Sequence, residues 1–202
     1  MNFNNNDIIN LFDSLNLDEE IQLSQIPDIP LYIDQIIQLF ESNLGNSKRN
    51  EGDKLLTKTM INNYAKDKLL FPIKNKKYTK AHILLIILTY DMKQILSISD
   101  IKEIFAPMIE QLSKEDEEFD IKDLYEKYLH IKSLQISRER EQISLLVNDI
   151  SKVYSFNSEN NIISNENDDY KSLLSLVLCL LNSANINKRL AEKIIDTYFK
   201  TT

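Results

Sequence analysis

Glycine is almost absent from this chain, and that scarcity constrains the possible folds more than any other feature. Both glycines lie in one polar segment, GNSKRNEGD at 45–53, and the 202 residues include only four prolines. Gly and Pro are the usual helix breakers, while the abundant Ile, Leu, Lys, Glu and Gln tolerate or favour helix. We therefore expect a mainly α protein, long enough to bury a core without disulfide or metal.

Apolar spacing predicts the order of the elements. We expect helices at about 7–15, 31–44, 57–70, 79–96, 101–105, 120–153, 170–182 and 187–199. Pro72 ends the third of these, and FPIKNKKYT at 71–79 reads as two short extended arms around Asn75, a residue that tolerates positive φ. This segment predicts a small β-hairpin. The helix at 170–182 is apolar nearly all round and should be buried.

Charge is distributed unevenly along the chain. The segment from Lys48 to Lys80 contains ten basic and three acidic residues, a net charge of +7. The whole chain carries −7, so the remaining residues carry −14. An acidic protein with one basic segment carries the electrostatic footprint of a polyanion site. On charge alone, a solvated lysine-rich face is an equal alternative.

The segment TKTMINNYAKDKLL at 57–70 shows which side of its helix is polar. Met60, Ile61 and Tyr64 recur at helical spacing and should be buried, with Thr57 or a neighbour as N-cap. We expect exposed side chains on the opposite face at Lys58, Thr59, Asn62, Asn63 and Lys66. Asparagine can pair with adenine in the major groove, and threonine can contact a thymine methyl.

Three segments resemble the MerR group of winged helix-turn-helix proteins. TMINNYAKDKLL resembles its second helix, T-I-R-Y-Y-x-x-x-G-L-L; KNKKYTKAHI resembles its wing, x-G-Y-R-x-Y-T-x-x-D-L; and LSISDIKEIF resembles its closing G-F-S-L-x-E-I-K-x-L-L. Residues 29–106 also resemble the family called domain of unknown function 1836, whose characteristic run is close to L-T-K-T-M-I-N-N-Y-x-K. In this comparison Lys68 replaces the MerR glycine before Leu69, and Lys76 takes the place of the wing arginine.

The resemblance implies a fold and a division of the chain. The fold is mainly α: an N-terminal MerR-like winged helix-turn-helix with a small β-hairpin wing, followed by an all-α C-terminal region. The expected domains are a lead-in at 1–28, the winged helix-turn-helix at 29–106, and a helical region at 107–202 for dimerisation and a possible effector, with a polar linker at 155–169.

The resemblance also implies a function, a DNA-binding transcriptional regulator. The expected DNA-binding residues are Lys58, Thr59, Asn62, Asn63, Lys66, Lys74, Lys76 and Lys77. Double-stranded DNA is the expected partner, together with a second copy of the chain in a homodimer, and the effector is unknown. The alternative is a helical protein–protein interaction module that keeps the winged-helix scaffold and does not bind DNA.

Other classes of function lack the residues they need. His82 and His130 have no metal-ligand spacing, the acidic KEDEEFD at 114–120 lacks the ligand pattern of a calcium loop, and Cys179 stands alone in an apolar run. No glycine-rich phosphate loop or G-x-S-x-G occurs. We expect no enzyme, no catalytic residue, no metal and no cofactor. With no leader and no membrane span in the sequence, we expect a cytoplasmic bacterial protein.

Overall fold

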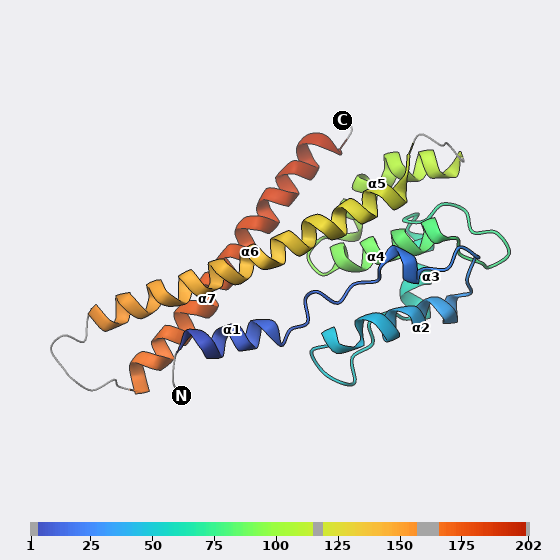
Figure 1. Cartoon of the computed structure of the whole chain (residues 1–202). Coiled ribbons are helices and arrows are strands. Elements are labelled where there is room, and N and C mark those ends of the chain that lie inside the picture. The colour runs from blue at the N-terminus through green and yellow to red at the C-terminus, as the bar shows by residue number, and fades with distance from the viewer. Residues whose placement is uncertain (1–3, 115–118, 157–165, 201–202) are drawn as a thin grey trace. The chain divides into compact units, whose positions relative to one another are not determined.

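The structure is a computed structural model that describes residues 4–114, 119–156 and 166–200 (Figure 1). Within these ranges it contains helices and no β-strand, so the expectation that helix predominates is confirmed. The α-helices are α1 (Asn5–Asp13), α2 (Ile33–Leu44), α3 (Lys58–Lys66), α4 (Lys80–Lys93), α5 (Ile98–Ser113), α6 (Ile121–Phe156) and α7 (Glu166–Tyr198), and short 3-10 turns lie at Leu23–Gln25 and Gly45–Ser47.

The chain forms two compact units. The first, called here the core unit, consists of Glu19–His130 and Lys188–Thr202, and the second, the long-helix unit, of Met1–Asp18 and Ile131–Asn187. The domain boundaries predicted after residues 28 and 106 stay a prediction, and most of the predicted linker, 157–165, lies outside the described residues.

The core unit is built around α4, which is buried on nearly every side. Each residue from His82 to Thr89 is buried, and α2, α3 and α5 pack against this helix through Phe40, Tyr64 and Phe105. Fully burying a large apolar side chain contributes about 1.5–3 kcal/mol. Burial of so long an apolar run therefore makes α4 the centre of the unit.

The termini of α3 follow from its sequence. Thr57 is the N-cap, as predicted, because its hydroxyl accepts a hydrogen bond from the Met60 N–H at 3.2 Å. At the other end the Leu69 N–H donates to the Tyr64 carbonyl and the Lys68 N–H to the Ala65 carbonyl. This is a Schellman cap, and it puts Lys68 in the left-handed region at φ 62°. Lys68 thus occupies a backbone position that favours glycine.

The predicted β-hairpin wing is wrong, because the described residues contain no strand. Residues 74–77 form a tight turn with one isolated bridge between Lys74 and Lys77, and Asn75 and Lys76 both have positive φ, 54° and 55°. Two features prevent β-sheet hydrogen bonding from continuing beyond this bridge. Pro72 has no N–H to donate, and Tyr78 pairs with Leu31, far away in sequence, instead of with the opposite arm. With no hairpin wing, the predicted winged helix-turn-helix fold is also wrong.

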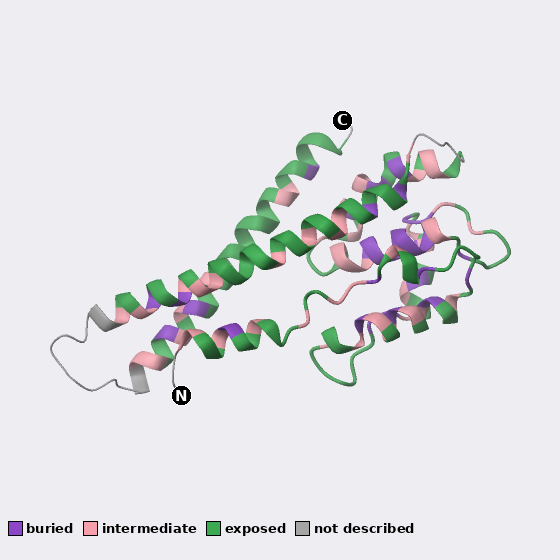
Figure 2. Cartoon of the chain, viewed as in Figure 1, coloured by how far each residue is buried: buried purple, intermediate pink, exposed green. Residues whose placement is uncertain are grey.

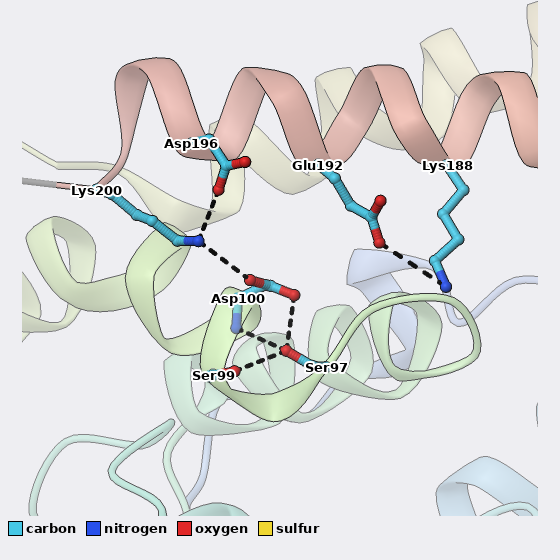
Figure 3. A network of polar contacts seen from close by, with 7 residues as sticks. All are labelled: Ser97, Ser99, Asp100, Lys188, Glu192, Asp196 and Lys200. Carbon is cyan, nitrogen blue, oxygen red and sulfur yellow. Dashed lines mark hydrogen bonds and ion pairs between the residues drawn. The ribbon is translucent and has the colours of Figure 1, made fainter.

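Helix α5 begins at a serine cap and continues past a proline. The Ser97 hydroxyl accepts from the Asp100 N–H at 3.1 Å and contacts the Asp100 carboxylate and Ser99 hydroxyl (Figure 3). The predicted helix was too short, because Pro107 lies inside α5 and not near its end. At the end of α7, Lys200 bridges Asp196 and Asp100, at 2.6 Å and 3.9 Å, which ties the C-terminal turn to the start of α5.

The long-helix unit joins α1 to the distal part of α6 and the first part of α7. Its core is small: Val147, Ile150 and Leu176 are buried, and Ile8 packs on them. Arg140 holds both carboxylate oxygens of Asp13 at 2.8 Å, which lowers the pKa of Asp13 through hydrogen bonding and attraction. The unit therefore has little buried apolar surface for the length of its helices.

Two predictions about α7 are wrong. One helix replaces the two expected at 170–182 and 187–199, because the intervening NSANIN contains neither Gly nor Pro and its Asn and Ser residues cost only tenths of a kcal/mol each in a helix. Residues 170–182 were also expected to be buried, but within a single chain only Ser172 and Leu176 of this stretch are buried (Figure 2).

Among the described residues, none of the helices combines the length and the apolar character needed to cross a bilayer.

Candidate nucleic-acid interface

Helix α3 presents one polar face. Ile61 and Tyr64 are 0% and 1% exposed and fix the inward side of the helix against the core. The opposite side carries five exposed residues, all of them predicted as DNA-binding: Lys58, Thr59, Asn62, Asn63 and Lys66. Their spacing keeps them on adjacent turns of one face. The predicted orientation of α3 is therefore confirmed, while DNA contact by these residues stays a prediction.

The three other predicted residues lie together on the 74–77 turn. Lys74, Lys76 and Lys77 are exposed, with Asn75 between the first two. The Lys77 N–H donates to the Lys74 carbonyl at 3.0 Å, which closes the turn. Both central residues have positive φ, the backbone of a type I′ turn. The turn exposes all three lysines, so it can present positive charge to a partner without a strand behind it.

The start of α2 brings the turn and α3 together. Leu31 and Tyr78 exchange two backbone hydrogen bonds, at 2.8 Å and 2.9 Å, and the Lys77 ammonium lies 5.1 Å from the centre of the Tyr32 ring. On its other side, α2 contributes Asp34, whose carboxylate pairs with Lys58 at 2.8 Å. The polar face of α3 and the lysine turn therefore both border the start of α2. We call these eight predicted residues and Tyr32 the basic surface.

A buried histidine anchors the base of the lysine turn. His82 stacks on Phe71 with ring centres 3.6 Å apart, and its Nε2 lies 3.2 Å from the Phe71 carbonyl. Its Nδ1 accepts from the Thr79 N–H at 3.2 Å, so this nitrogen is unprotonated and Nε2 carries the proton that the carbonyl accepts. Burial lowers the pKa of His82, which favours this neutral form. Because Phe71 and Thr79 border the turn, His82 holds both of its ends.

Two lysines, one in the basic surface and one beside it, occupy backbone positions that favour glycine. Lys68 follows α3 and Lys76 lies in the turn, with φ of 62° and 55°. A residue with a Cβ atom pays roughly 1–2 kcal/mol for this conformation. The chain therefore carries positive charge at two positions where glycine would be more stable. Backbone strain of this kind tends to occur at functional sites.

Acidic residues neutralise part of the basic segment. Lys58 pairs with Asp34, Lys80 with Asp28 at 3.0 Å, and Lys48 with Glu41. Lys80 also lowers the pKa of Asp28 through its hydrogen bond and charge. The Lys58–Asp34 pair is exposed on both sides, so an anionic ligand can compete for Lys58, whereas the Lys48 and Lys80 side chains are only 16% and 15% exposed. The charge available to a partner is consequently smaller than the sequence total of +7 suggests.

Sequence patterns did not identify two further contributors. Tyr32 is 52% exposed beneath Lys77, and only the Leu31–Tyr78 pairing brings it there. Lys93, at the end of α4, lies 5.7 Å from the Tyr64 ring centre and lines an open hollow of about 450 Å³ with Lys48, Arg49 and Lys54. Met60 of α3 also lines this hollow, so positive charge continues from α3 onto the loop before it. No pattern in the sequence links Lys93 to the basic segment.

Two other features of the core unit bear on ligands. An apolar cavity of about 520 Å³ lies among α4, α5 and α6, where the Tyr128 hydroxyl donates to Asp91 at 3.3 Å. Its volume lies within the range of small-molecule sites, roughly 300–1,000 Å³. Over the described part of the chain, His, Cys, Asp and Glu side chains form no group of three that could hold a metal ion.

Comparison with known proteins gives one result. No curated protein and no solved structure matches the chain. Residues 21–128, more than half of the chain, match the family described as Domain of unknown function (DUF1836). This range covers α2 to α5, the basic surface and the first residues of α6. The chain is therefore a member of the DUF1836 family.

Proposed function

We propose that this protein binds double-stranded DNA through the basic surface and acts as a transcriptional regulator. The observation that carries the proposal is the juxtaposition of the α3 polar face and the lysine turn at the start of α2. A single helix face with amides and a separate cluster of lysines match the two tasks of DNA recognition, which are reading bases and holding phosphates.

The residues of α3 suit base contacts. The exposed amides of Asn62 and Asn63 can each donate to and accept from adenine N7 and N6, and the Thr59 methyl can contact thymine. A helix of this diameter fits the major groove of B-form DNA. Lys58 and Lys66, at the two ends of α3, would then lie near phosphates on either side of the groove.

The lysine turn suits phosphate contacts. Lys74, Lys76 and Lys77 are exposed on a backbone that His82 fixes at both ends, so phosphate binding would order their side chains but little further backbone. Lys68 adds charge at the cost of backbone strain. Without a hairpin wing, the turn can reach the backbone next to α3 but offers no strand to enter a groove.

The first test measures the salt dependence of binding. A labelled pool of random 24-base-pair duplexes is titrated with protein at several salt concentrations. If all five lysines of the predicted set meet phosphates, the slope of log K against log salt should approach about −4.5 per chain, at roughly −0.9 for each phosphate. Lys76→Ala with Lys77→Ala should reduce the magnitude of this slope by about two units. Lys152→Ala, an exposed lysine of α6 in the long-helix unit, is the matched control and should change nothing.

The second test separates base reading from phosphate binding. Sequences are selected from the random pool by the parent protein, and the selected and unselected duplexes are compared. Asn62→Ala and Asn63→Ala should each lose roughly 1–3 kcal/mol of preference for the selected sequence while binding the random pool as the parent does. If the preference survives in both variants, α3 does not read bases. A flat salt response would refute DNA binding itself and would favour the alternative, an acidic protein partner on the same surface.

A further inference from the structure

Helix α7 is apolar on two opposite sides within the long-helix unit. One side faces α6 and α1: Leu176 is 4% exposed in the small core, and the Ser175 hydroxyl lies 2.8 Å from the Tyr154 hydroxyl. Leu174 and Leu178 lie two residues before and after Leu176, which puts them on the far side of a helix with 3.6 residues per turn. A surface helix normally has one apolar side and one polar side.

Five large side chains make up this outer side, called here the α7 face. Their exposed fractions are 64% for Tyr170, 44% for Leu174, 52% for Val177 and 57% for both Leu178 and Leu181. Side chains of this size, about half exposed, each present on the order of 80–100 Å² of apolar surface, or roughly 450 Å² together. The largest apolar patch of a typical monomer covers about 300–600 Å², and patches of this size are often functional.

We propose that a second copy of this chain covers the α7 face, with the two α7 helices antiparallel about a twofold axis near Leu176. The area supports this occupant: two such faces, when covered by each other, bury roughly 900 Å², close to the roughly 1,000 Å² that marks a specific interface. A twofold axis places the same patch on both sides, so Leu174 of one copy meets Leu178 of the other. The proposal does not depend on DNA binding.

The charges along α7 favour the antiparallel direction. Lys188 lies twelve residues after Leu176, which puts it on the side of the α7 face, whereas Asp169, seven residues before Leu176, lies on the covered side and Asp168 pairs with Lys171 at 2.9 Å. In a parallel pair the Lys188 side chains of the two copies would meet and repel each other, whereas an antiparallel pair places them at opposite ends of the interface. The face itself carries no charged residue between Lys171 and Lys188.

Sedimentation velocity from 1 to 100 µM tests whether a second copy of the chain covers the α7 face. The full chain should sediment with twice its mass of 23.6 kDa. The double variant Leu174→Gln with Leu178→Gln should weaken dimerisation at least tenfold, while Ile95→Gln, which removes an apolar side chain 60% exposed on the core unit, should leave it unchanged. A monomer at every concentration, or a dimer that the double variant leaves intact, would overturn the proposal.

A distance measurement tests the geometry without disturbing the face. A spin label at Asn185→Cys, in a Cys179→Ser background, lies nine residues from the proposed axis. At 1.5 Å per residue the two labels of an antiparallel dimer are about 27 Å apart along the helices, against about 10 Å in a parallel pair. A short distance would refute the antiparallel arrangement. Because this measurement leaves the five apolar residues in place, it remains decisive even if the glutamine variant fails to fold.

Discussion

Two buried tyrosines should respond in opposite directions to the same substitution, replacement by phenylalanine. The Tyr64 ring is 1% exposed, and its buried hydroxyl has no hydrogen-bond partner among the described residues. The Tyr125 hydroxyl, equally buried, donates to the Ile21 carbonyl at 2.8 Å. Leaving a buried polar group unpaired costs about 1–3 kcal/mol, whereas a made hydrogen bond contributes about 0.5–1.5 kcal/mol.

These values give the expected size of each effect. Tyr64→Phe removes an unpaired hydroxyl and should raise the free energy of unfolding by about 1 kcal/mol. Tyr125→Phe breaks a bond and leaves the Ile21 carbonyl unpaired, so it should lower the free energy by about 1–3 kcal/mol. Urea unfolding followed by circular dichroism measures both, and Tyr198→Phe, at a site 79% exposed, is the control with no expected change. A loss of stability in Tyr64→Phe would show that its hydroxyl is satisfied and would refute the reasoning.

The pH dependence provides an independent check on Tyr64. Burial raises its pKa from 10.0 to about 12, so the folded protein keeps the phenol neutral where the unfolded chain ionises. The contribution is fully present below pH 10 and is lost as the pH rises from 10 toward 12. The decline in stability above pH 10 should therefore be less steep in Tyr64→Phe than in the parent.

Three further predictions concern single side chains. Burial lowers the pKa of His82 below its usual 6.5, so as the pH falls the unfolded chain binds a proton before the folded protein does. The urea concentration at the midpoint of unfolding should therefore fall as the pH drops below 6.5. This fall should be smaller in His82→Phe. Ser97→Ala removes the cap on the Asp100 N–H and should cost about 1 kcal/mol in the same assay. Lys68→Gly should stabilise the core unit by about 1 kcal/mol in thermal melts, and an unchanged melting temperature would argue against strain at φ 62°.

Local patterns predicted the elements better than their pairing. The Thr57 cap, the inward side of α3 and the positive φ of Asn75 all follow from residues within a few positions of each other, and the structure confirms them. The hairpin prediction failed because Tyr78 pairs with Leu31, a contact between segments that no local pattern connects. The position of Tyr32 beneath Lys77 depends on that same contact and was missed for the same reason.

The failures on α7 have a different cause. Its apolar residues were expected to be buried because a helix that is apolar all round is normally a core helix. In one chain, however, α6 and α1 cover only the side that carries Leu176. The other side stays exposed within one chain, and its covering by a second copy is our proposal, because the apolar pattern alone does not name a partner.

Two lysines in strained backbone positions, Lys76 in the basic surface and Lys68 beside it, allow a test that separates the proposed DNA-binding surface from an ordinary solvated face. A lysine on a helix surface costs almost nothing, so its presence alone says little about function. Lys68 and Lys76 are different, because each occupies a left-handed position at a cost of roughly 1–2 kcal/mol. If their only role were solubility, glycine at these two sites would leave DNA affinity unchanged and simply raise stability. If they meet phosphates, the same substitutions should raise stability and weaken DNA binding together, with a salt slope reduced by about 0.9 for each lysine.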